Sequence, residues 1–341
     1  MNDLSDAPRP LRRPYAGETY YDRPALKPAP WEWLVGAYIG VAGLAGGAQV
    51  LATLFRRASP RKARGIVRNA RWLAIGGSAA GGALLVADLR TPRRFYNMMR
   101  IFRPTSPMSI GTYVLLGFSG LSGLTLLGEL PLGRGRIARA AKRTADAAQL
   151  PAAVAGAAMG TYTAALLSAT STPVWAASPR HLGAKFAASS IATSAAALSI
   201  GERLGGRHET ADRLDAIAAM AAGAQIAVTA VNKRHRAHAE VASATRETTA
   251  GRTRETADLL VAGAVPLAAY AAYRLSGNRQ PGLALFAAAA VIAGGFLSRD
   301  ATIKLGQRSA ERPRDYFRFA QEEHLPAQHK TSPRENSGWP R

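Results

Sequence analysis

Long apolar stretches, each of roughly 16–25 residues, limit how this chain can fold more than any other feature. A helix needs about 20 such residues to cross roughly 30 Å of hydrocarbon. Leu, Ala and Gly dominate the stretches, and no strand-like alternation recurs, which argues against an outer-membrane barrel. We therefore expect an all-α integral membrane protein over residues 31–300, a bundle of eight transmembrane helices in two four-helix halves. The expected spans are about 33–55, 72–89, 110–130, 152–177, 182–200, 214–231, 259–273 and 282–297.

Charged residues gather between the apolar stretches and at the two ends of the chain. Residues 1–30 and 301–341 are polar and are expected to form extended N- and C-terminal arms. The net charge of +22 comes from arginines that cluster beside apolar stretches, which favours contact with lipid headgroups over nucleic-acid binding. Short basic linkers at 56–71 and 134–143 favour a cytoplasmic position, which would place both termini on the non-cytoplasmic side.

The residues available for redox cofactors are few. Cysteine is absent, so we expect no iron–sulfur cluster and no Cys-based zinc site in this chain. A membrane b-type haem normally needs axial histidines on spanning helices, and none of the six histidines falls inside an expected span. His235 and His238 could hold a metal, but their basic neighbours favour a solvated loop. We therefore expect neither haem nor metal.

The segment from Asp88 to Ser109 joins two apolar stretches and is rich in arginine, proline and aromatic residues. Such a segment cannot lie in lipid, so we expect an ordered element at the membrane surface. Asp88 stands beside Arg90, Arg93 and Arg94. It could close the helix end through a local ion pair, or it could donate or accept a proton for a ligand at the interface.

Two apolar stretches carry residues that suit either helix packing or a flat ligand. In the first, Gly36 and Gly40, and likewise Gly43 and Gly47, lie on one helix face and allow close approach. In the fourth, hydroxyl groups could bond neighbouring helices or a quinone carbonyl, to which Tyr162 would offer its phenolic proton.

Four segments resemble the NrfD / polysulfide-reductase membrane-subunit family, over about residues 18 to 320. The most specific is Asp88-Leu-Arg-Thr-Pro-Arg-Arg-Phe-Tyr-Asn-Met-Met-Arg-Ile-Phe-Arg-Pro-Thr-Ser-Pro-Met-Ser109. The others are Tyr20–Trp33 leading to Gly43–Gly47, Tyr162–Thr170, and Gly306–Ala310. Some members place a histidine near the first span in the quinone site, and this chain has none there.

The resemblance implies a haem-free membrane subunit of the prokaryotic inner membrane that binds menaquinone or ubiquinone. Its expected partners are a four-cluster ferredoxin-like iron–sulfur subunit and a molybdopterin or multihaem catalytic subunit. The chain itself would hold no redox centre.

We expect quinone between the glycine face of the first span and the fourth span, with Asp88 and Tyr162 handling protons. The expected binding residues are Glu32, Gly43, Gly46, Gly47, Arg90, Arg94, Ser168 and Thr170. Two other hypotheses remain open: a structural anchor without quinone chemistry, and a proton-translocating or transport subunit.

Overall fold

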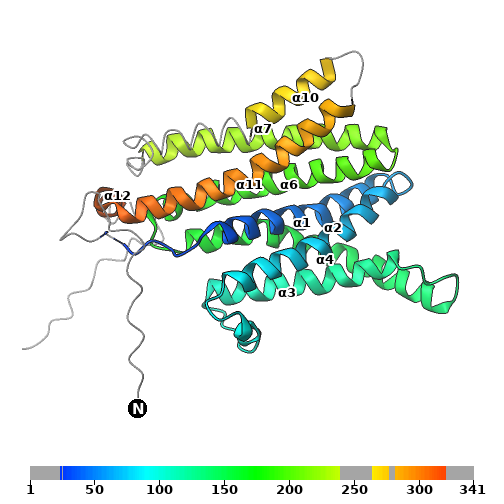
Figure 1. Cartoon of the computed structure of the whole chain (residues 1–341), viewed down its shortest axis with the longest axis horizontal. Helices are drawn as coiled ribbons and strands as arrows, with labels where there is room; N and C mark the ends of the chain where they lie inside the picture. The colour runs from blue at the N-terminus through cyan, green and yellow to red at the C-terminus, as the bar shows by residue number, and fades with distance from the viewer. Residues whose placement is uncertain (1–23, 25, 239–262, 276–280, 320–341) are drawn as a thin grey trace, which may run out of the picture.

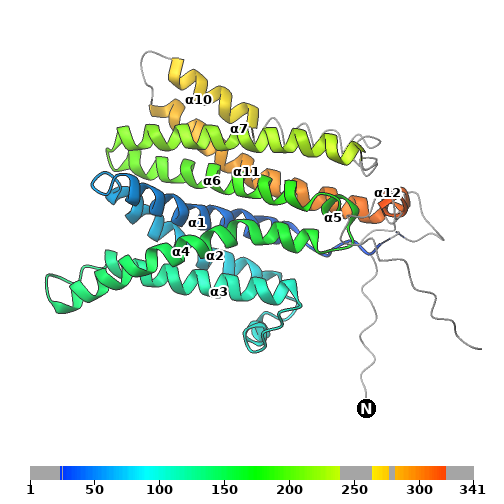
Figure 2. The ribbon, with the colours of Figure 1, turned by 180° about the vertical axis from the view of Figure 1, so that it is seen from behind.

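The computed structural model describes residues 24, 26–238, 263–275 and 281–319, and all regular structure among them is helical (Figures 1 and 2). The long helices run antiparallel or parallel to one another in a single bundle. They are α1 (Trp33–Ala58), α2 (Arg64–Asp88), α3 (Pro107–Leu126), α4 (Arg136–Ser168), α6 (Pro179–Leu204), α7 (His208–His238), α10 (Val265–Leu275) and α11 (Pro281–Glu311). Short elements are η1 (Pro92–Met99), η2 (Leu127–Glu129), α5 (Pro173–Ala176) and α12 (Pro313–Phe319).

The long helices form two groups that meet at α1 and α6. In the first group α1 packs on α2 and α4, and α3 packs on α4. In the second, α6 packs on α7 and α11, and α10 lies along α11. We call the end with η1, α5 and α12 the η1 end, and the other the far end (Figure 1).

Small residues allow helices to approach closely, both within the first group and between the two groups. A side chain at Gly46 would clash with the backbone of Gly156 on α4, and one at Gly47 would clash with Ser190 and Ser194 on α6. Close contact of this kind is the usual basis of helix association in lipid, where hydrophobic burial gives little driving force.

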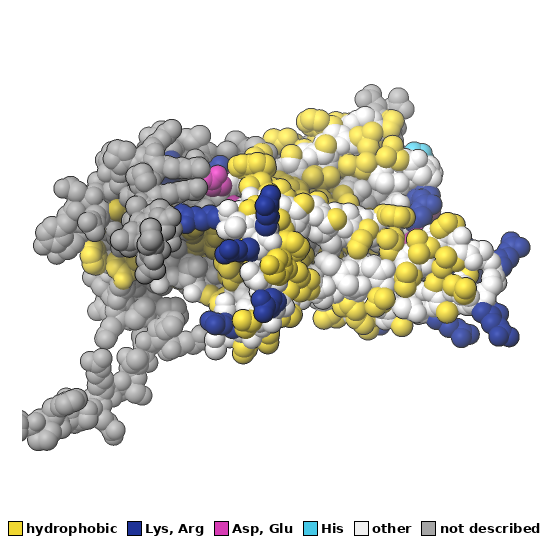
Figure 3. All heavy atoms as spheres, turned by 60° about the horizontal axis from the view of Figure 1, so that its bottom comes forward, with side chains coloured by type: hydrophobic (Ala, Val, Ile, Leu, Met, Phe, Trp, Pro, Cys, Tyr) yellow, Lys and Arg dark blue, Asp and Glu magenta, His cyan; other side chains and the backbone are white. Residues whose placement is uncertain are grey.

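Among the described residues, six helices are long and apolar enough to cross a membrane: α1, α2, α4, α7 (over His208–Arg234), α11, and α3 together with η2. Figure 3 shows Lys and Arg side chains toward both ends of the face it presents, and hydrophobic side chains with few charged ones between them. Of the other expected spans, α6 has the length but contains many hydroxyl residues. Its Ser189, Ser190, Thr193 and Ser194 are buried inside the bundle. The described part of α10 has 11 residues, and 259–262 lie outside the described residues.

Several helix boundaries differ from the expectation. The basic linker 56–71 is largely helical, since α1 ends at Ala58 and α2 begins at Arg64. Likewise α4 begins at Arg136, before the expected 152. Ala, Arg and Lys are strong helix formers, so these helices continue beyond their apolar parts. The expected end at 177 is also wrong, because α4 stops at Ser168 and Pro173 starts α5 after a turn.

The expected extended C-terminal arm is wrong for residues 301–319. Here α11 continues to Glu311 and α12 follows. The described part of the N-terminal arm packs against this region, since Leu26 N donates to Ala310 O and Gln307 Nε2 donates to Trp31 O. Tertiary contacts thus hold a polar segment that composition alone would leave extended. Residues 1–23, 25 and 320–341 lie outside the described residues.

Candidate functional site

A pocket of about 430 Å³ lies among α1, α2, α3 and α4 at the η1 end. It reaches along α2 from Asp88 to Ser78, which is roughly 15 Å at a rise of about 1.5 Å per residue. Its volume falls within the range of small-molecule sites, about 300–1,000 Å³. The side chains around it are mostly apolar and include Val35, Ile39, Leu85, Val86, Leu115, Leu116, Leu166 and Leu167.

The surface element η1 adjoins the end of the pocket that lies nearest Asp88. Its Phe95, Met98 and Met99 belong to the pocket lining, although each is substantially exposed. The backbone of η1 is held to α3, because Tyr113 Oη donates to Met99 O at 3.0 Å. The segment after Asp88 is therefore an ordered element, as its composition predicts.

The arginines of this segment are exposed. Within the described part of the chain, neither Arg90 nor Arg94 forms an ion pair with Asp88, and neither lines the pocket. Asp88 itself is exposed and belongs to the lining. The local ion pair that could close the helix end does not form here, which leaves the carboxyl group available at the pocket.

Tyr162 on α4 meets the pocket from the opposite side. Its hydroxyl donates to Pro107 O, at the start of α3, over 3.2 Å. The approach requires a glycine at 111, because a side chain there would clash with the Tyr162 ring. Tyr38 on α1 also lines the pocket and is 5% exposed. Two phenols and a carboxyl group thus adjoin one apolar pocket.

Two buried hydroxyl groups in the lining have no hydrogen-bond partner. They are Ser78 Oγ on α2 and Thr163 Oγ1 on α4. Ser78 is 8% exposed and Thr163 is 2% exposed. A buried polar atom without a partner is costly, and such atoms beside a pocket can be satisfied by a ligand that accepts hydrogen bonds. The pocket therefore suits an elongated apolar molecule with carbonyl oxygens, which is the chemistry of a quinone.

Other residues expected at the site lie elsewhere. Gly43 faces Arg299 of α11 and Ser190 of α6, and Gly46 and Gly47 also face helices rather than the pocket. At the end of α4, Ser168 Oγ donates to Ala164 O at 2.8 Å, and in the turn that follows Thr170 Oγ1 donates to Leu167 O at 2.7 Å. Glu32 is exposed just before α1 and is not part of the lining.

Tyr38 and Ser78 line the pocket although the sequence analysis does not name them. Thr163 is one of the hydroxyl residues of the fourth apolar stretch, where quinone contact is expected, but the sequence does not single it out from the others. For Ser78 and Tyr38, the sequence does not show which face of each helix borders the pocket.

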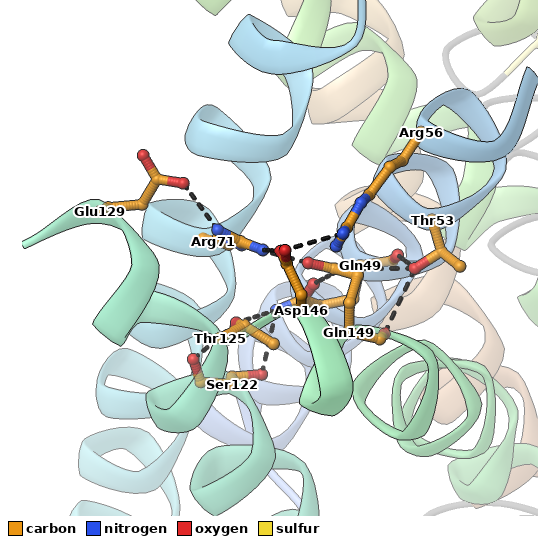
Figure 4. A network of polar contacts seen from close by, with 9 residues as sticks. All are labelled: Gln49, Thr53, Arg56, Arg71, Ser122, Thr125, Glu129, Asp146 and Gln149. Atoms are coloured by element: carbon orange, nitrogen blue, oxygen red, sulfur yellow. Dashed lines mark hydrogen bonds and ion pairs between the residues drawn. The ribbon is translucent and has the colours of Figure 1, made fainter. Parts of the chain in front are cut away.

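A network of polar side chains that the sequence does not predict joins helices of the first group (Figure 4). Arg71 is 4% exposed, and its Nη1 lies 2.8 Å from Glu129 while its Nε donates to Gln149 at 3.1 Å. Gln149 Nε2 in turn donates to Gln49 Oε1 at 2.7 Å. Gln49 Nε2 donates to Thr125 Oγ1 of α3 at 3.1 Å. The chain of bonds ties α1, α2, α3 and α4 together.

Comparison with known proteins gives a family and a fold. A family model described as polysulphide reductase, NrfD, matches residues 24–308. Among solved structures, one similar chain comes from "The structure of bd oxidase from Geobacillus thermodenitrificans". The TM-score is 0.52 at 13% identity, with 84% of this chain and 86% of that chain covered. At that identity the likeness concerns the fold alone. No curated protein matches.

Proposed function

The chain belongs to the polysulphide reductase NrfD family, and from that membership we propose that it is the haem-free, quinone-binding membrane anchor subunit of a modular respiratory oxidoreductase. Menaquinone or ubiquinone would bind in the α1–α4 pocket. The observation behind this proposal is the pair of orphan hydroxyl groups, Ser78 Oγ and Thr163 Oγ1, in the lining of an otherwise apolar pocket.

The residues of the pocket have different roles in binding and in proton exchange. The apolar side chains of α2 and α3 bind the ring and the start of an isoprenoid tail and exclude water. Ser78 and Thr163 donate hydrogen bonds to carbonyl oxygens. Asp88, exposed at the η1 end, exchanges protons with the membrane surface. Tyr162 holds a phenolic proton at the pocket, currently directed at Pro107 O. A bound quinone would supply the two-electron chemistry that the described side chains lack.

The η1 end is the face that we assign to the redox partner, a four-cluster ferredoxin-like iron–sulfur subunit with a molybdopterin or multihaem companion. Exposed Arg90 and Arg94 beside the pocket would steer an acidic partner surface to this face. Placing the quinone pocket at the same end shortens the distance for electron transfer. The proposal further includes eight spans, insertion in a prokaryotic inner membrane, and the η1 end on the non-cytoplasmic side.

Two variants test the quinone site directly. In the purified complex, Asp88→Asn and Tyr162→Phe are expected to lower quinone-linked turnover by roughly 100-fold, the typical contribution of a positioned acid or base. Ser168→Ala is the control, because its hydroxyl bonds its own helix and lies outside the lining. Wild-type turnover in both pocket variants would contradict the assignment, and absence of quinone from the complex would favour a purely structural anchor.

One observation favours a second function, proton translocation. A network runs from the partly exposed Glu129 and Asp146 through the buried Arg71 and Gln149 to Gln49, and it provides hydrogen-bonding groups from the far end into the bundle. Proton uptake by proteoliposomes containing the complex tests this function, and turnover without any transmembrane proton movement would remove it.

A further inference from the structure

Arg299 on α11 is buried at the junction of the two helix groups, and only neutral oxygens accept hydrogen bonds from it. It is 1% exposed. Its Nη2 donates to Ser190 Oγ at 2.7 Å and to Phe186 O at 3.2 Å, and its Nη1 donates to Ile39 O. The guanidinium carbon also lies 5.0 Å from the centre of the Phe186 ring. No carboxylate within the described residues forms an ion pair with it.

Two other arginines whose side chains are little exposed, Arg71 and Arg203, are paired with carboxylates. Arg71 pairs with Glu129 at 2.8 Å and lies 3.7 Å from Asp146. Arg203 pairs with Asp212 at 2.9 Å and also with Asp215. Each has two acidic neighbours, as expected where a charge is removed from water. Arg299 therefore leaves one positive charge in the bundle without an acidic counterpart among the described residues.

This charge lies behind the wall of the α1–α4 pocket. Ile39, whose carbonyl oxygen accepts from the guanidinium, is part of the pocket lining. Ser190, the second acceptor, donates in turn to Gly160 O on α4 at 3.3 Å. Gly160 is one turn before Thr163, which also lines the pocket. The guanidinium thus bonds directly to α1, which forms one wall of the pocket. It is linked to α4, which forms another wall, through the side chain of Ser190.

We propose that Arg299 is a positioning residue that supplies a fixed positive charge behind this wall and favours an anionic ligand in the pocket. This inference rests on the proposed quinone site. Reduction of a quinone takes two electrons, from the iron–sulfur partner, and two protons, and negative charge arrives with an electron before a proton compensates it. Arg299 stabilises that negative charge through the low-dielectric wall.

Two naphthoquinones of nearly the same shape test the inference by binding alone. The probe 2-hydroxy-1,4-naphthoquinone is an anion at neutral pH, and 2-methoxy-1,4-naphthoquinone is neutral. In the purified complex, Arg299→Gln is expected to weaken binding of the anion by about tenfold. This is the effect of removing one charge on the order of 10 Å away at an effective dielectric constant of about 20. Binding of the neutral analogue should change by less than about twofold.

Two further variants separate charge from packing. Arg299→Lys keeps the charge, and Ser190→Ala removes one neutral acceptor while the charge stays, so both should keep the wild-type ratio of the two affinities. Equal weakening of both probes by Arg299→Gln would overturn the inference and leave the quinone site intact. Failure of both probes to bind the wild-type complex would instead overturn the quinone site.

A measurement on the wild-type complex covers the case in which Arg299→Gln does not fold. The hydroxynaphthoquinone changes colour when it ionises, so its pKa can be titrated while it is bound. A nearby positive charge should lower that pKa below the value in water. A raised pKa would mean that burial outweighs the charge and would overturn the inference.

Discussion

Replacing Thr163 with valine should stabilise the ligand-free bundle and weaken quinone binding at the same time. Thr163 is 2% exposed, and its Oγ1 has no hydrogen-bond partner. Valine has nearly the same shape and removes only the hydroxyl group. An unsatisfied buried polar group costs about 1–3 kcal/mol, so the free energy of unfolding should rise by about 1 kcal/mol, the low end of that range.

The effect on binding has the opposite sign. If Thr163 Oγ1 donates to a quinone carbonyl, its removal loses one neutral hydrogen bond, worth about 0.5–1.5 kcal/mol. The dissociation constant should therefore rise roughly 2- to 12-fold. Thermal unfolding of the ligand-free complex in lipid nanodiscs measures the first effect, and titration with a neutral quinone analogue measures the second.

Thr161→Val is the matched control. Thr161 lies two residues away on the same helix, its Oγ1 already donates to Ala157 O at 2.9 Å, and it is not part of the pocket lining. Its replacement should leave quinone affinity unchanged. Loss of stability in Thr163→Val together with unchanged affinity would refute the reasoning, because it would mean that the hydroxyl serves the fold and not a ligand.

Three further substitutions have expected outcomes. Gly111→Ala should push Tyr162 out of place and weaken quinone binding by about fivefold or more, which titration measures, since off-rotamer side chains and shifted backbone cost about 1–3 kcal/mol. Gly46→Ala should lower thermal stability without a specific effect on quinone affinity, because the new methyl group meets the Gly156 backbone. Arg71→Met should destabilise the bundle by about 1.5–3 kcal/mol, seen as lost yield and early unfolding, since it leaves the half-buried Glu129 and the buried amide of Gln149 without their partner.

Positions with open surroundings provide the controls. Gly117→Ala on α3 and Gly82→Ala on α2 have no atom within 4 Å of the added methyl group, so both should leave thermal stability unchanged. The pair of Lys62 with Glu209 is exposed on both sides, so Lys62→Ala should change stability by less than about 1 kcal/mol. A Gly46→Ala protein as stable as Gly82→Ala would contradict the close contact of α1 with α4.

The all-helical fold could be predicted because apolar length alone nearly determines it in lipid. The apolar pattern does not show that several helices continue into polar sequence. Residues 136–151 are rich in Ala, Arg and Lys, and they extend α4 without adding hydrophobicity. The region after Arg299 is similar, since α11 continues through contacts such as Gln307 Nε2 to Trp31 O, which no local pattern indicates.

The candidate site could be predicted in part. Asp88 and Tyr162 stood out because a carboxyl group at a span end and a phenol within a span are unusual, and both line the pocket. The glycine face of α1 was a sound sign of close approach, but spacing does not say what approaches. At Gly43 the neighbour is the guanidinium of Arg299, and at Gly46 it is the backbone of Gly156. Such neighbours come from distant parts of the sequence and depend on how the helices pack, within a group at Gly46 and between the groups at Gly43.

The most direct test of the quinone site is to find where a photoreactive azidoquinone attaches in the purified complex. We expect labelled peptides from residues 78–88 of α2 and 108–119 of α3, with labelling that unlabelled quinone competes away and that Thr163→Val reduces. Labelling confined to the second helix group, α6, α7, α10 and α11, would contradict the proposed site.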